Sequence, residues 1–209
     1  MDCTHIPEIS CFYSDTIASH ILNPSAHFEY EMILVTDGSA QVQIHDRTYP
    51  LQRGSLLFIS RLEQHQFCIV KEPYCRYVLS VSSDLLLSHL NEPRLASIFM
   101  QRPEYFSHVV QLNEEQLAYF LPFFQKNADE YEKQPDFYTL QSIALLLSIL
   151  ISLYRLYPNA FPMEDSSSLS AAVLNAQIYV SRHFNRKLTL QEIADQCFLN
   201  RHTLSLAFK

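Results

Sequence analysis

The sequence predicts an α+β protein, in which an antiparallel β-sandwich or small β-barrel is followed by helices and by a helix-turn-helix unit. Three observations lead to this prediction. Apolar residues tend to recur with period two from about residue 28 to residue 82, as in half-buried antiparallel strands. After residue 82 the period becomes helical. The last 39 residues read as three helices, the first beginning near Ser170 and the last two carrying recognisable N-caps.

Half a dozen short strands are expected in the first half of the chain. The clearest covers residues 40–45, where apolar and polar residues alternate. It follows Asp37-Gly38, a dipeptide typical of hairpin turns because glycine tolerates positive φ. A second turn is expected at residues 52–54, which contain Gly54. The predicted strands are 30–36, 40–45, 48–51, 55–60, 66–70 and 76–81.

Helical segments follow at residues 84–90 and 94–100, with one more strand expected at 107–112. A longer amphipathic helix then begins at Asn113, which is a good N-cap, and Pro122 should bend it. The next helix, at residues 137–157, is apolar nearly all round, so one core face cannot cover it. It is therefore either completely buried within one chain or paired with another subunit.

Composition excludes several classes of protein. The chain has only two glycines, which excludes multi-glycine phosphate-binding loops. Its five cysteines form no C-x-x-C pair, so a reducing cytoplasm is expected rather than a disulfide framework. The acidic N-terminus does not resemble a secretory signal, and the most apolar run, 143–157, has 15 residues against the ~20 that cross a bilayer. No membrane partner is expected.

Charge changes sign along the chain. The formal net charge is −7, but residues 171–209 hold five basic and two acidic side chains, a net +3. Residues 158–170 are polar and rich in proline and serine, as in a linker. The expected organisation is a sheet domain over 1–112, a helical segment over 113–157, the linker over 158–170, and a basic helical unit over 171–209 that suits contact with phosphates.

The C-terminal unit is predicted to be a helix-turn-helix. Thr189 and Glu192 stand three apart as a capping box, and Asn200 can cap a final helix. Small Ala194 allows the two helices to approach closely. The alternative is an ordinary small helical bundle with a cap. If the unit reads the major groove, the residues expected to contact DNA are Thr189, Arg201, His202, Ser205 and Lys209.

These residues carry a family resemblance. The run Leu188-Thr-Leu-Gln-Glu-Ile-Ala194, with Cys197-Phe-Leu-Asn200 and Leu204-Ser-Leu-Ala-Phe-Lys209, resembles the first helix-turn-helix of AraC/XylS-type transcription regulators. His27, Glu31, Gly38, Gly54 and His65 resemble the cupin-type barrel with which many such regulators sense a small molecule. The resemblance implies a cupin-like antiparallel barrel, a dimerising helical segment at 113–157, and a ligand-responsive homodimer that binds DNA.

The sequence departs from the family pattern at two places. The chain stops at Lys209, inside the recognition helix of the first unit, before the second unit that family members have. Leu206 stands where the family frequently has arginine. Weak DNA binding is therefore expected of this chain, because fewer base and phosphate contacts are available.

The effector site is expected inside the barrel. Its candidate residues are His27, Glu29, Glu31, Arg53 and His65, with aromatic cover from Phe12 or Tyr13. An inward-pointing Arg53 would favour an anionic effector, and dominant glutamates would favour a sugar or an amine. A catalytic residue, a cofactor and a metal are not expected, because Ser25 replaces the first histidine of the cupin metal motif. The alternative is a cupin-type metalloenzyme or binding protein with His27, Glu31 and His65 as ligands.

Overall fold

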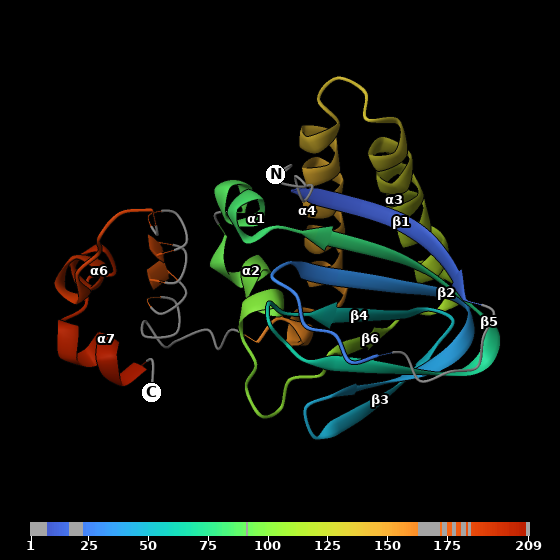
Figure 1. Ribbon diagram of the computed structural model, residues 1–209, viewed down its shortest axis with the longest axis horizontal. Helices are drawn as coiled ribbons and strands as arrows, with labels where there is room; N and C mark the ends of the chain where they lie inside the picture. The colour runs from blue at the N-terminus through green and yellow to red at the C-terminus, as the bar shows by residue number, and fades with distance from the viewer. Residues whose placement is uncertain are drawn as a thin grey trace.

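The structure, a computed structural model, describes residues 8–16, 23–90, 92–162, 172, 175–176, 179–180, 183 and 185–207. Within these residues one six-stranded antiparallel sheet is followed by helices, so the α+β class is confirmed (Figure 1). The strands are β1 (Ile9–Thr16), β2 (Tyr30–Ile44), β3 (Arg47–Gln52), β4 (Ser55–Ile59), β5 (His65–Val81) and β6 (Val109–Gln111). The strand β1 was not predicted from the sequence.

The long central strand β2 differs from the expectation. The predicted hairpin at Asp37-Gly38 is wrong, because β2 continues through both residues and shifts its register against β5 at this point. Gly38 has φ +72°, and a Cβ there would lie 2.1 Å from the carbonyl oxygen of Pro73. Positive φ therefore makes a bulge here rather than a turn. The two strands predicted at 66–70 and 76–81 are likewise one strand, β5.

The sheet curls around an apolar interior. Its order is β1-β5-β2-β4-β6, with β3 paired to the second half of β2, and in the described residues it does not close into the expected barrel. Ile33 and Ile44, near opposite ends of β2, belong to one buried cluster, so the two halves of the sheet face each other. Met32 and Leu34 alternate with Ile33 and point to the other face, where the helices pack.

Four helices cover that outer face: α1 (Ser83–His89), α2 (Pro93–Met100), α3 (Glu114–Lys133) and α4 (Tyr138–Leu156). Asn113 caps α3 in a reciprocal capping box with Gln116, and Pro122 lies inside this helix. In Figure 1, α3 and α4 lie side by side next to β1. The expected positions of these helices are confirmed to within one residue at the start of each.

The helix α4 is a core helix with one uncovered side. It is long and apolar enough to cross a membrane by length and composition, with 39% of its most apolar window buried. Its residues Leu146, Ile149 and Leu153 are fully buried in the main core, whereas Leu140 and Leu156 are about half exposed. The short 3-10 helix η1 (Pro158–Ala160) and the buried Phe161 continue this packing, so the first residues of the expected linker belong to the packed body.

Two short helices end the described chain, α6 (Leu190–Gln196) and α7 (Arg201–Ala207). The Thr189 hydroxyl accepts a hydrogen bond from the backbone N–H of Glu192, and the Asn200 side chain accepts one from that of Thr203, so both N-caps are confirmed. The Glu192 carboxylate bonds Tyr179 and Arg186, so the described residues do not form the reciprocal half of the expected capping box. Ala194 and Leu204 are buried where the two helices meet. Figure 1 shows this pair apart from the sheet. Lys209, one of the residues expected to contact DNA, lies outside the described residues.

Candidate functional site

A cluster of polar side chains lies against the apolar interior of the sheet. We call it the polar cluster and define it as Ser25, His27, Glu31, His65 and Ser80. Glu31 is on the same face of β2 as the interior residue Ile33, and its cross-strand partner on β5 is Ser80. An isolated antiparallel bridge joins Ser25 to His65 and brings the chain before β2 onto the start of β5. Residues far apart in sequence therefore meet here.

Both histidines of the polar cluster are oriented by the backbone. Nδ1 of His27 lies 3.1 Å from the carbonyl oxygen of Glu29, and Nδ1 of His65 lies 2.8 Å from that of Glu63. Because a carbonyl oxygen only accepts, each Nδ1 carries the proton and each Nε2 of the neutral ring keeps its lone pair. Nε2 of His65 is 2.8 Å from the Ser25 hydroxyl. The two rings meet edge to face, with centroids 5.2 Å apart.

Glu31 contacts both its neighbours. Oε1 accepts a hydrogen bond of 2.9 Å from the Ser80 hydroxyl, and Oε2 lies 3.2 Å from Nε2 of His27. This second contact falls outside hydrogen-bond geometry, and the buried Nε2 has no hydrogen-bond partner among the described residues. The Glu31 carboxylate raises the pKa of His27 against the effect of burial. Burial acts to raise the pKa of Glu31, but His27 and Ser80 outweigh it and leave this pKa below its ordinary value.

A buried ionic network supports the polar cluster from behind. The Glu63 carboxylate accepts hydrogen bonds from Arg102 at 3.0 Å and from the backbone N–H of Ser60 at 2.8 Å, and it contacts Nε2 of His108 at 2.9 Å. Burial opposes ionisation of Glu63, but these partners lower its pKa to about 2. Because the Glu63 carbonyl fixes Nδ1 of His65, the network positions that histidine.

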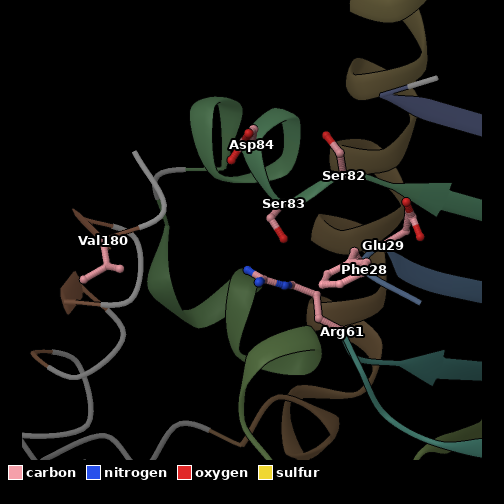
Figure 2. Close-up of a pocket in the computed structure, with 7 residues that line it drawn as sticks. All are labelled: Phe28, Glu29, Arg61, Ser82, Ser83, Asp84 and Val180. Carbon is pink, nitrogen blue, oxygen red and sulfur yellow. The ribbon is translucent and has the colours of Figure 1, made fainter. Parts of the chain in front are cut away.

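Glu29 lines a separate pocket of about 370 Å³ beside the polar cluster. Figure 2 shows Arg61 and Ser83 pointing toward each other, with Phe28 beside them and Val180, from the C-terminal helical segment, on the far side. The pocket is lined by Phe28, Glu29, Arg61, Ser82, Ser83, Asp84 and Val180. Since Glu29 also lies 3.8 Å from Nδ1 of His27, the pocket and the polar cluster adjoin.

The structure brings His27, Glu29, Glu31 and His65 together but places Arg53 elsewhere. The Arg53 guanidinium is about half exposed and pairs with Glu114 at the start of α3, at 3.0 Å. Arg53, expected among the residues of the effector site, therefore lies apart from the polar cluster. Tyr13 stacks on Tyr77 over the helical side of the sheet and does not cover the polar cluster.

Sequence reasoning missed Arg61, Glu63, Arg102 and His108. The segment Arg61-Leu-Glu-Gln-His65 carried a usable signal, because two charged residues precede His65 within a predicted loop. No sequence signal identified Arg102 and His108 as partners of Glu63, because they lie 39 and 45 residues from it in the chain. These contacts depend on how the loop before β5 packs against the segment between α2 and β6, and periodicity does not report such packing.

The residues expected to contact DNA lie on the C-terminal pair. Arg201 and His202 are exposed at the start of α7, Ser205 is half buried, and Thr189 caps α6; Lys209 lies outside the described residues. Arg186, a contributor to the basic charge, is paired with Glu192 and the Tyr179 hydroxyl.

The chain thus combines a curled antiparallel sheet, a polar cluster in its interior and a helical layer on its outer face. The AraC-like ligand binding domain family matches residues 7–150, and the chain belongs to that family. A search of curated proteins found no match.

Solved structures of ToxT from Vibrio cholerae share the fold. The structure bound to an unsaturated fatty acid is 10% identical, covers 96% of this chain and 72% of that chain, and has a TM-score of 0.51. The structure bound to (E)-4-(8-methylnaphthalen-1-yl)but-3-enoic acid is 13% identical, covers 96% and 74%, and has a TM-score of 0.50. The family points to a regulator rather than an enzyme.

Proposed function

We propose that the protein is a ligand-responsive, DNA-binding transcription regulator of the AraC type. The observation that carries this proposal is the succession, in one chain, of an AraC-like ligand binding domain over residues 7–150 and a pair of capped helices, α6 and α7, with exposed basic residues. A cytoplasmic location belongs to the same proposal.

The effector site that we propose comprises the polar cluster and the adjoining pocket of Figure 2. The ligands in the ToxT structures support small-molecule binding by this fold. Here Arg53 is held by Glu114, whereas the described residues that line the pocket and the polar cluster include Glu29, Glu31 and Asp84 against one arginine, Arg61. This balance favours an effector with hydroxyl or amino groups over a simple anion.

The lining of the pocket suggests how effector binding changes the orientation of the DNA-binding unit. Its wall includes Val180 from the C-terminal segment as well as Glu29 and Ser83 from the sheet body. A ligand that contacts both parts favours the arrangement in which both contacts form, and so shifts the population of orientations of α6 and α7.

In this proposal α7 enters the major groove through Arg201, His202 and Ser205, while Thr189 and Lys209 contact phosphates. Leu206, about half exposed on α7, gives an apolar contact where the family frequently has a charged one. Weak, salt-sensitive binding by this chain is expected, in the micromolar rather than the nanomolar range.

A homodimer through α3 and α4 completes the proposal. Tyr119, Leu140, Ile151 and Leu156 leave apolar surface exposed on these two helices. Light scattering across micromolar concentrations should give twice the mass of the chain, and Ile151→Ser should lower it; a strict monomer would contradict the dimer.

Thermal-shift and calorimetric binding measurements with glucose, putrescine and oleate test the effector site. We expect glucose or putrescine to bind and Glu31→Gln and Arg61→Gln each to weaken binding at least tenfold. Arg53→Gln is the matched control, because its ion pair is exposed and remote from the cluster. Binding that survives both site substitutions, or binding of oleate alone, would contradict the proposal.

A further inference from the structure

We propose that His27, Glu31 and His65 form a binding site for a divalent transition-metal ion, with zinc as the preferred ion. The inference rests on the proposed effector site for its location only, and metal binding is measured without DNA. The metal would give the site an open coordination position for a hydroxyl or amino group of the effector.

Donor atoms of three side chains lie close together, and one pair of them already has the spacing of ligands on a metal ion. One donor atom from each of His27, Glu31 and His65 lies within 4.8 Å of the others. Nε2 of His27 and Oε2 of Glu31 are 3.2 Å apart. Two ligands at roughly 2.0–2.1 Å from a tetrahedral zinc ion stand about 3.3–3.4 Å from each other. The existing gap thus already has the required size.

The hydrogen bonds of the two rings prepare their Nε2 atoms as ligands. Metal-binding histidines commonly donate the other ring N–H to a backbone carbonyl or a carboxylate, which fixes the tautomer. Here Nδ1 of His27 and Nδ1 of His65 each meet a backbone carbonyl oxygen. The lone pair on Nε2 of His27, which has no hydrogen-bond partner among the described residues, faces the Glu31 carboxylate. A metal ion between them would use both groups.

Glu31 supplies the third ligand, and Ser25 is the group that must release His65. The Ser80 hydroxyl holds one oxygen of Glu31 and leaves the other toward His27. The Ser25 hydroxyl, 2.8 Å from Nε2 of His65, would turn aside or serve as a weak fourth donor when that nitrogen binds metal. With two neutral imidazoles and one carboxylate, a divalent ion keeps one net positive charge, which attracts a further oxygen or nitrogen donor.

The ligand set also selects among ions. Calcium and magnesium prefer oxygen ligands, so a site with two imidazole nitrogens disfavours both. Imidazole and carboxylate together suit zinc and its neighbours such as cobalt and iron. The cysteines described in the structure are not members of this group.

Titration of the chelator-treated, dialysed full chain with zinc and with cobalt tests the inference. We expect one equivalent of each ion to bind, and the cobalt complex to show intense d–d absorption without a thiolate charge-transfer band. His27→Gln, His65→Gln and Glu31→Gln should each weaken zinc binding at least tenfold. His89→Gln, which alters an exposed histidine on α1, is the matched control and should leave the affinity unchanged.

Urea unfolding and circular dichroism establish that each variant is folded before its affinity is compared. Absence of one-equivalent binding by the wild type would overturn the inference, as would equal weakening in His89→Gln or a cobalt spectrum with thiolate ligands. Binding of an organic effector by the metal-free chain and binding of DNA are measured separately. A failure of metal binding can therefore be distinguished from a failure of the proposed function.

Discussion

Glu63 joins the fold to the polar cluster, and Glu63→Gln should both destabilise the protein and change how its stability depends on pH. The side chain is 5% exposed, and its carboxylate faces Arg102 and His108. Glutamine keeps the shape and the bond from the Ser60 backbone but removes the charge. Arg102 would then be left largely buried without its ionic partner, and that is costly.

The pKa of Glu63 gives the magnitude. Its value falls from 4.5 to about 2 in the folded state. At about 1.4 kcal/mol per pH unit, this corresponds to a stabilisation of about 3 kcal/mol. Because the folded pKa is depressed, the stabilisation is complete above pH 4.5 and is lost as the pH falls toward 2. The difference between wild type and Glu63→Gln should therefore be about 3 kcal/mol at pH 7 and shrink steadily between pH 4.5 and pH 2.

Urea unfolding of both proteins at pH 7, 5, 4 and 3 measures this difference directly. Glu104→Gln, which changes an exposed carboxylate in the segment next to Arg102, is the control and should lie within about 0.5 kcal/mol of wild type at every pH. A Glu63→Gln variant within that same range at pH 7, or a difference that does not vary with pH, would refute the account of the ionic network.

Three further substitutions test the fold. Gly38→Ala should cost at least about 2 kcal/mol in urea unfolding, because φ is +72° and the new Cβ would meet the Pro73 carbonyl; wild-type stability would contradict the bulge. Asn113→Ala should cost about 1 kcal/mol by removing the capping box of α3, and an unchanged midpoint would argue against the box. Leu204→Ala should increase protease cleavage within α6 and α7, whereas Leu206→Ala, an exposed change, should not; equal cleavage would argue against their packing.

Much of the fold could be predicted because local chemistry fixes it. The caps at Asn113, Thr189 and Asn200 involve residues three apart, so the sequence shows both partners. The prediction of a hairpin at Asp37-Gly38 was wrong because the sequence does not show the contact that decides the conformation there. Positive φ suits a turn and a bulge equally, and the approach of the β5 backbone to Gly38, which decides between them, is a long-range contact.

The polar cluster was partly predictable for the same kind of reason. Glu31 lies in the predicted strand 30–36, His27 comes just before that strand, and the family resemblance adds His65. Arg53 was misplaced because a turn residue has no face set by periodicity, and its partner Glu114 lies 61 residues away. The pocket containing Arg61 likewise depends on packing between β4, α1 and the C-terminal segment.

Sequence-specific DNA binding is the property that a regulator of the AraC type must have. Selection from a random duplex pool at low salt, followed by anisotropy at fixed salt on the selected and scrambled duplexes, tests it most directly. We expect one enriched sequence bound with micromolar affinity. Arg201→Ala should lose at least tenfold in affinity for the selected duplex, and Arg53→Gln should bind it as the wild type does. Absence of an enriched sequence, or equal binding of both duplexes by wild type and Arg201→Ala, would contradict it.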